Sequence, residues 1–396
     1  MSALTSSLPE IGVPDAWTQK LRDWVGRDKL SLRAMPVPEA AVITAWPLGF
    51  TGSSGEYFRI WIVNVALSIV TLGLYGPWAR VRTRQYFYAN TLLDGHNFGY
   101  TARPVALLGG YLVIGALLLV FTLTQNFDGA SWVSAVLLGV AALLYPWVLF
   151  RSVRFQAHHS LHRGVRFGFL GGLGGAYLYY GLLNLALPFT FGLTLPLQSA
   201  LQRRYLATGL SYGEARGSFR GGISGVYLVY LLASLALLGA ATLLTVIGVV
   251  LAALRVFDGL NAKQQLGQLL GALLPLSLIL ALSALSYAAA GQGIRAALLR
   301  YTLSHLQLGQ TLRVRTTFSP WMVAWIALSS GLVQLVSFGL ATPWAAVRRN
   351  RYMLPRIEVL SLAPLGDFSA RPRRDEKAPG ENALGEAAAE LLGFRL

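Results

Sequence analysis

Glu56 is the foremost side chain in this 396-residue chain that could do chemistry, because it stands at the start of an apolar stretch. Arg59 follows one helical turn later, and Asn64 lies deeper in the same stretch. An ionisable group at the mouth of such a segment is a candidate for function by default. The alternative is an ion pair between Glu56 and Arg59 at a helix start, where an acidic residue is favoured anyway. We treat Glu56, Arg59 and Asn64 as a candidate polar site.

Sequence signatures of enzymes are missing. The chain has no Cys, no G-x-S-x-G, no Walker loop, no H-E-x-x-H and no two acids close enough in sequence to indicate a catalytic pair. His158, His159 and His162 have metal-ligand spacing, but no nearby carboxylate completes a set, and a basic interfacial helix is the favoured interpretation. We therefore predict no catalytic residues, no cofactor and no metal, and we favour a role other than catalysis.

Arginines cluster directly after apolar stretches, and the whole positive charge lies there. Between Ala45 and Leu360 the chain has 23 Arg or Lys against 6 acids, and Lys263 is the single Lys. Arg binds phosphate groups in a bidentate manner, which favours anionic lipid headgroups as partners. Retention of positive charge on the cytoplasmic side is the alternative explanation. The candidate headgroup-binding residues are Arg80, Arg82, Arg84, Arg203, Arg204, Arg348, Arg349 and Arg351. Nucleic acid is disfavoured, because the clusters adjoin apolar stretches.

Composition explains where these residues must sit. The chain is 54% hydrophobic and 13% charged, with a net charge of +16 and a mean hydropathy of +0.52, so it belongs in a bilayer. A spanning helix needs about 20 apolar residues. Runs close to that length occur at Val105–Thr124, Trp132–Phe150, Gly225–Leu254 and Leu269–Ala290.

One short pattern recurs three times and divides the chain into repeats. A hydroxyl residue is followed by Gly two positions on and by Pro four positions beyond that, which predicts a break and restart of a helix. The predicted hairpin breaks are Gly73 and Pro77, Gly192 and Pro196, and Gly339 and Pro343. We predict five helical hairpins, with the first, third and fifth short or re-entrant. The alternative is that each of these three units is a single spanning helix.

We therefore predict an all-α polytopic membrane protein made of internally repeated helical hairpins, with Arg-rich interfacial helices. Small cytoplasmic strands are expected in the linkers, such as Asp94–Tyr100 and Leu312–Phe318. The predicted domains are a soluble or interfacial amphipathic segment (1–45), a repeated transmembrane domain (46–360) and a disordered tail (361–396).

The first unit carries a family resemblance. The run Phe50–Asn64, its continuation through Thr71–Gly73 to Pro77–Arg82, and Asp94–His96 resemble the YjgN-like family of bacterial inner-membrane proteins. The resemblance spans roughly residues 50–358. It implies a polytopic protein of the cytoplasmic membrane, and it supplies no substrate and no catalytic residues.

Two function classes stay open at this stage. Repeated broken hairpins are typical of transporters or channel-like proteins, here for an unidentified small solute or lipid. The alternative is a lipid-binding or membrane-organising scaffold without transport or catalysis. For either class we expect a multi-pass protein of the bacterial inner membrane with both termini cytoplasmic. Anionic membrane lipids are the expected partners, and homo-oligomerisation is left open.

Overall fold

The computed structural model describes residues 44–125, 131–258, 265–309 and 312–361, with side chains for all of these except residues 131, 251–276 and 278. The predicted amino-terminal segment (1–45) and the predicted tail (361–396) lie almost wholly outside the described residues. Both therefore stay predictions.

The described chain repeats one unit five times, and each unit runs strand, helix pair, strand. The first unit comprises β1 (Thr44–Phe50), α2 (Ser54–Val70), α3 (Gly76–Ala89) and β2 (Thr91–Leu93). The second comprises β3 (His96–Tyr100), α4 (Pro104–Thr124), α5 (Ser131–His159) and β4 (Ser160–His162). The third comprises β5 (Val165–Phe169), α6 (Leu173–Ala176), the π-helix η1 (Tyr177–Leu182), α7 (Leu183–Leu185), α8 (Leu195–Gly209) and β6 (Leu210–Tyr212).

The last two units follow the same plan. The fourth comprises β7 (Ala215–Phe219), α9 (Ile223–Asp258), α10 (Gln265–Ser304) and β8 (Leu306–Leu308). The fifth comprises β9 (Leu312–Thr316), α11 (Pro320–Val336), α12 (Thr342–Met353), the short 3-10 helix η2 (Leu354–Arg356) and β10 (Ile357–Ser361). Every helix pair thus begins after one strand and ends before another.

The ten strands close into one antiparallel barrel in the order β1-β10-β9-β8-β7-β6-β5-β4-β3-β2. Consecutive units are joined by β-hairpins, as where Leu93 of β2 pairs with His96 of β3. The ring closes at β1, which pairs with β10 at Thr44 and Ser361 and with β2 at Leu48 and Leu93. The prediction of an all-α fold is therefore wrong. The linker segments are strands that satisfy one another's backbone groups in a common barrel, which leaves no open sheet edge.

Side chains fill the inside of this barrel. Leu93 and Leu312 are buried in one apolar cluster, against which Trp46, Phe98 and Val359 pack. These residues come from strands on opposite sides of the ring, since β3 and β9 are separated by several strands in either direction. Residues along a barrel strand alternate between interior and exterior, so these short strands each contribute only one or two side chains to the interior.

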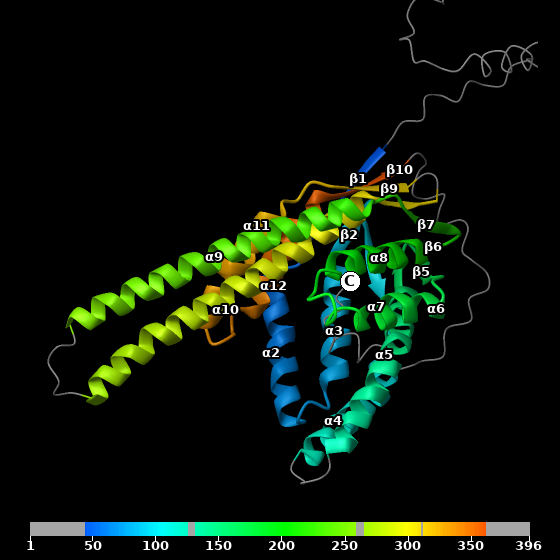
Figure 1. The fold of residues 1–396 in the computed structure, drawn as a ribbon. Coiled ribbons are helices and arrows are strands. Elements are labelled where there is room, and N and C mark those ends of the chain that lie inside the picture. Colours follow the sequence, from blue (N-terminus) through cyan, green and yellow to red (C-terminus); the bar gives the residue numbers. More distant parts are fainter. Residues whose placement is uncertain (1–43, 126–130, 259–264, 310–311, 362–396) are drawn as a thin grey trace, which may run out of the picture. The chain divides into compact units, whose positions relative to one another are not determined.

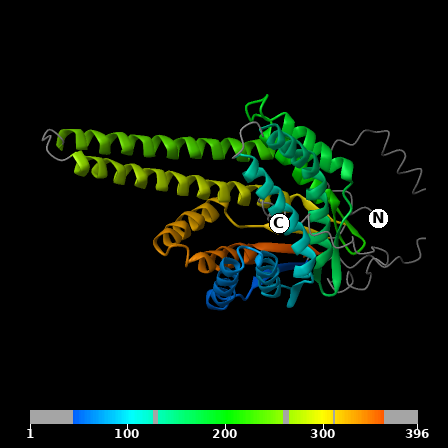
Figure 2. The ribbon, with the colours of Figure 1, turned by 90° about the horizontal axis from the view of Figure 1, so that it is seen from below.

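Three described helices are long and apolar enough to cross a membrane: Pro104–Thr124, Trp132–His159 and Ile223–Val250. Pro320–Val336 is apolar but shorter. Of the predicted apolar runs, Leu269–Ala290 lies in α10, where many side chains are outside the described set. Figures 1 and 2 both show α9 and α10 running side by side as the longest helix pair. The described residues thus support three candidate spans.

Candidate membrane-contact site

The three predicted hairpin breaks are turns of one kind. In the first, the Thr71 hydroxyl donates to the Leu67 carbonyl at 2.7 Å and accepts from the Tyr75 N–H at 3.0 Å. In the fifth unit, Ser337 Oγ accepts from the Ala341 N–H at 3.1 Å. In the third, the Thr190 and Thr194 hydroxyls lie 2.8 Å apart. The hydroxyl residue of the sequence pattern therefore satisfies backbone or side-chain groups that the turn frees.

The Gly and Pro of the pattern shape the rest of the turn. Gly73, Gly192 and Gly339 have φ angles of +90°, +79° and +86°, a conformation that glycine adopts without steric cost. Pro77, Pro196 and Pro343 stand in the first turn of α3, α8 and α12, where a missing N–H does no harm. The three turns define the tips of the short helix pairs.

Apolar side chains stand fully exposed at these three tips. Leu72, Phe191 and Phe338 are 95%, 96% and 97% exposed, and each has a φ angle near +50°. A bulky residue in this left-handed region is a conformational outlier, whereas Asn, Asp and Gly are at home there. Exposing a Leu or Phe side chain to water costs free energy, and transfer of that side chain into hydrocarbon is favourable. The three tips thus present large apolar side chains on their outer surface.

Two barrel turns provide an internal comparison. Asp94 and Arg163 share the left-handed φ angle of +51°, and each is also followed by Gly. Their side chains are charged and form an ion pair of 2.8 Å between Arg163 Nη1 and Asp94 Oδ2. The same local conformation is thus occupied by charged residues at the barrel and by large apolar residues at the helix tips. The barrel turns of the units are therefore suited to water, and the helix tips are suited to apolar surroundings.

Polar side chains hold the arms of each short pair together. Asn64 is buried, and its Nδ2 donates to the Ala79 carbonyl of α3 at 3.3 Å. Gln198 of α8 donates to Asn184 of α7. In the fifth unit Arg348 Nη1 donates to Ser329 Oγ at 2.8 Å and to Ser330 Oγ at 3.0 Å. Such bonds fix two helices against each other where apolar surroundings offer no other partner.

The candidate polar site is spread along α2 rather than gathered. Glu56 and Arg59 are exposed, and among the described residues they form no ion pair with each other. The Glu56 N–H donates to Ser53 Oγ at 3.2 Å, and its carboxylate accepts from the Tyr86 hydroxyl at 3.4 Å. Glu56 therefore lies in the first turn of α2, where an acid is favoured. A functional role for Glu56, Arg59 and Asn64 stays a prediction.

The predicted headgroup-binding arginines fall into two groups. Arg82, Arg204 and Arg351 are exposed, although Arg351 Nη2 also donates to the Gly52 carbonyl at 3.1 Å. Arg203 is partly buried and donates to Thr302 Oγ1 at 3.3 Å, and burial lowers the pKa of its guanidinium.

The remaining arginines of that set lie against aromatic rings or are half-buried. Arg80 and Arg348 stack on the rings of Tyr111 and Trp344 at 4.8 Å and 5.0 Å. Arg84 Nη1 donates to the Tyr100 hydroxyl at 2.9 Å. Arg349 is half-buried in α12. Lipid binding by the whole set stays a prediction, and the exposed members are the best placed for it.

An aromatic clasp recurs in the units and was not foreseen from sequence. The Tyr86 hydroxyl donates to the Ser53 carbonyl at 2.7 Å and accepts from the Ser53 N–H at 2.8 Å. The hydroxyls of Tyr205 and Tyr301 donate to the Gly172 and Gly222 carbonyls at 2.9 Å and 2.6 Å. Each hydroxyl thus ties the second helix of a unit to the start of its first helix. Burial raises the pKa of Tyr86 above its ordinary value of 10.0.

The clasp residues share one spacing to the strand that follows them. The five residues Tyr86, Phe155, Tyr205, Tyr301 and Tyr352 each stand five positions before the second strand of their unit. In the sequence an aromatic often ends an Arg cluster, but the pattern alone gives that aromatic no partner. Without knowledge of the strand that follows, the common register of the five positions could not be recognised.

His162 and Tyr212 form a polar pair among the apolar side chains of the barrel. His162 Nε2 donates to the Leu93 carbonyl at 3.2 Å, and the Tyr212 hydroxyl donates to the His162 carbonyl at 3.2 Å. Phe98 lies against the His162 ring, with a centroid distance of 4.6 Å. Burial lowers the pKa of His162 and raises the pKa of Tyr212. His158 and His159 take separate partners, Arg166 and the Phe155 carbonyl, so the three histidines do not converge on one point.

The fold and the tips together define a class of protein in which helix pairs of two lengths project from a β-barrel. The chain belongs to the family described as "Bacterial protein of unknown function (DUF898)", which matches residues 45–391. No solved structure matches the chain.

Similar curated proteins are named for the inner membrane. The chain is 34% identical over 132 residues to the inner membrane protein YjgN of Salmonella typhimurium, which is 33% of each chain. It is also 34% identical over 125 residues to the inner membrane protein YjgN of Escherichia coli, which is 30% of each chain. The matched region thus spans about a third of the length of these relatives. Their names fit the three apolar helices found here.

Proposed function

We propose that this protein binds and organises membrane lipid by inserting the tips of its three short helix pairs into one leaflet of the inner membrane. The observation that carries the proposal is the exposed, left-handed Leu72, Phe191 and Phe338, set against the charged Asp94 and Arg163 in the same conformation. Neighbouring residues extend the apolar tips, since Val70, Phe189 and Val336 are 79%, 84% and 81% exposed. Exposed apolar surface of this kind marks contact with a membrane or a partner.

Helix length supports insertion to half depth. The apolar part of α2, Ile60–Val70, rises roughly 16 Å, whereas the hydrocarbon core of a bilayer is about 30 Å thick. The candidate span Ile223–Val250 has 28 residues and rises roughly 42 Å, which is enough to cross. Short and long helix pairs that project from one barrel would therefore insert more protein volume into one leaflet than into the other. Unequal insertion into the two leaflets thins or bends a bilayer locally. This is the membrane-organising role that we infer.

Connectivity supports a single orientation for all units. Each helix pair starts and ends at the barrel, so the Arg-bearing helix ends next to the strands share one side of the membrane. Positive residues are retained on the cytoplasmic side. We therefore place the barrel and both termini in the cytoplasm, in a multi-pass protein of the inner membrane.

Transport, the other predicted function, stays a prediction. The barrel, which we place in the cytoplasm, offers no route across the bilayer, and apolar and aromatic side chains of several strands pack inside it. The inside of the barrel therefore gives transport no support, and the lipid-organising function is the one that we favour.

Insertion of the tips can be measured directly, because the chain contains no Cys. A single Cys at Phe191 and another at Asp94 are each labelled with the fluorophore NBD, and the full chain is reconstituted in vesicles of phosphatidylethanolamine and phosphatidylglycerol. We expect blue-shifted emission from position 191 and strong quenching by nitroxides placed along the acyl chains. Position 94 is the matched control, with the same backbone conformation and water-like emission. Equal, water-like emission from both positions would overturn the proposal.

A further inference from the structure

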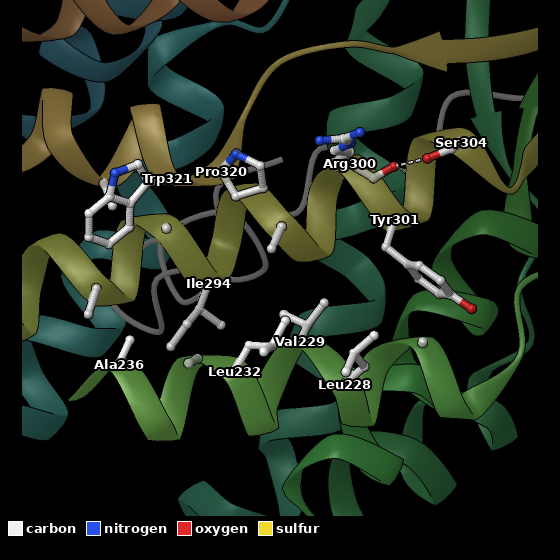
Figure 3. A pocket seen from close by; sticks show the side chains of 16 residues that line it. Leu228, Val229, Leu232, Ala236, Ile294, Arg300, Tyr301, Ser304, Pro320 and Trp321 are labelled. Carbon is white, nitrogen blue, oxygen red and sulfur yellow. Dashed lines mark hydrogen bonds between the residues drawn. The ribbon is translucent and has the colours of Figure 1, made fainter. Parts of the chain in front are cut away.

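A long apolar groove lies between three helices of the last two units. It has a volume of about 660 Å³, and α10 lies between the two walls supplied by α9 and α11. Sixteen residues line it, and Arg300 is the only charged residue among them. Figure 3 shows Leu228 and Leu232 of α9 facing Ile294 of α10, with Trp321 toward one end of the groove and Arg300 toward the other. The volume falls within the range of roughly 300–1,000 Å³ that is usual for ligand pockets.

The groove has the length of an acyl chain. Its α9 wall extends from Gly225, next to the barrel, to Ala236, a rise of roughly 16 Å along the helix. This stretch belongs to the candidate span Ile223–Val250. The groove therefore starts at the barrel end of a membrane-crossing helix and continues along it in the direction that a lipid chain would take.

The charged end of the groove fits an anionic group. Arg300 is exposed and uses Nη1 to donate to the Phe318 carbonyl at 3.2 Å, while a guanidinium carries five N–H donors in all. Its guanidinium points toward Pro320 at the amino terminus of α11 in Figure 3, where the helix dipole adds partial positive charge. Tyr301, beside it, has its hydroxyl committed to the Gly222 carbonyl and presents its ring to the groove.

We propose that this groove binds one anionic phospholipid, with an acyl chain along α9 and α10 and the phosphate on Arg300. The proposal rests on the lipid-organising function argued above and names the lipid class that such a protein would select. A zwitterionic lipid would have the same chain but would bring its own cation to Arg300, so charge complementarity selects the anionic lipid. The short tips insert into bulk lipid without headgroup selection, whereas the groove holds a single lipid.

Native mass spectrometry of the purified full chain tests the groove. The probes are phosphatidylglycerol and phosphatidylcholine with identical acyl chains. We expect the wild type to retain one phosphatidylglycerol, and Arg300→Gln to lower that retention about tenfold. Ala236→Phe, which fills the far end of the groove at an exposed position, should lower the retention of both lipids. Arg295→Gln is the matched control, because Arg295 is exposed on the same helix and does not line the groove.

Several outcomes would overturn the groove proposal. Equal retention by Arg300→Gln and Arg295→Gln would mean that the lipid is not held through Arg300. Full competition by glycerol phosphate at millimolar concentration would mean that the site takes a water-soluble phosphate instead. Thermal melting checks the folding of Arg300→Gln, and Arg300→Lys, which keeps the charge, should retain most of the lipid. The NBD measurement at position 191 is independent of this site, so failure of the groove and failure of tip insertion are distinguishable.

Discussion

At the scale of single residues, His162 is the described group that most directly links pH to the integrity of the barrel. Burial lowers its pKa below the ordinary value of 6.5, and the nearby charges of Arg163, His96 and Asp94 contribute smaller effects of both signs. The unfolded chain therefore takes up a proton at this ring before the folded barrel does. The resulting stabilisation is complete above about pH 6.5 and is lost as the pH falls from there through the folded pKa.

We accordingly expect the wild-type melting temperature to fall on acidification from pH 7.5 to pH 5.5. His162→Gln should be less stable at pH 7.5, because the bond to the Leu93 carbonyl is weakened, but its melting temperature should fall less over the same interval. The measurement is thermal unfolding in detergent, followed by circular dichroism. Parallel pH dependences in the two proteins would show that another group dominates.

At the scale of elements, the tyrosine clasps join the second helix to the start of the first helix in the first, third and fourth units. The glycines beside the clasps have no space for a larger side chain. A Cβ at Gly171 would lie 3.0 Å from the Tyr205 ring and 2.5 Å from Phe169, and a Cβ at Gly225 would lie 2.4 Å from the Tyr301 ring. Ring and backbone are thus in direct contact at the start of the first helix, and the hydroxyl bond completes the junction.

Removing a single clasp hydroxyl should weaken the fold without rearranging it. Tyr205→Phe and Tyr301→Phe should each lower the free energy of unfolding by about 0.5–1.5 kcal/mol, the usual net contribution of one hydrogen bond. Tyr86→Phe should lower it by more, because the Tyr86 hydroxyl both donates to and accepts from Ser53. Phe155, which occupies the same position in the second unit, shows that the ring alone is tolerated there. Tyr227→Phe serves as the control, since Tyr227 is 42% exposed, and it should change nothing. Chemical denaturation gives the values, and losses equal to that of the control would exclude the clasp.

At the scale of the whole molecule, the barrel obliges all five units to share one orientation. Single Cys variants at Arg166 and Arg216, exposed on barrel strands, should react with a membrane-impermeant maleimide only from the cytoplasmic side. A Cys at Gln125, at the far end of α4, should react only from the periplasmic side. Both expectations follow because each helix pair begins after one barrel strand and ends before the next barrel strand. Labelling of position 166 from the periplasm would contradict the proposed topology.

How far sequence reasoning reached can be judged from particular residues. The turns at Gly73, Gly192 and Gly339 were foreseen because Gly and Pro constrain the backbone locally, whatever surrounds them. Three of the predicted apolar runs are helices of spanning length, because length and composition alone decide that property. The Arg clusters were located, but their contacts with Tyr100, Thr302 and Ser329 depend on neighbouring strands and helices and could not be read from spacing.

By itself, the sequence determined the local properties of this protein: its repeats, its breaks, its apolar helices and the side of each repeat on which positive charge gathers. Only the tertiary structure decided that the linkers form a barrel. Several strands are three residues long, which is too short for a periodic pattern, and closure joins Thr44 to Ser361 across the whole described chain. The groove at Arg300 likewise exists only once α9, α10 and α11 pack together. Turns and apolar helices depend on residues that are neighbours in the sequence, whereas barrel closure and grooves depend on contacts between residues that are distant in the sequence.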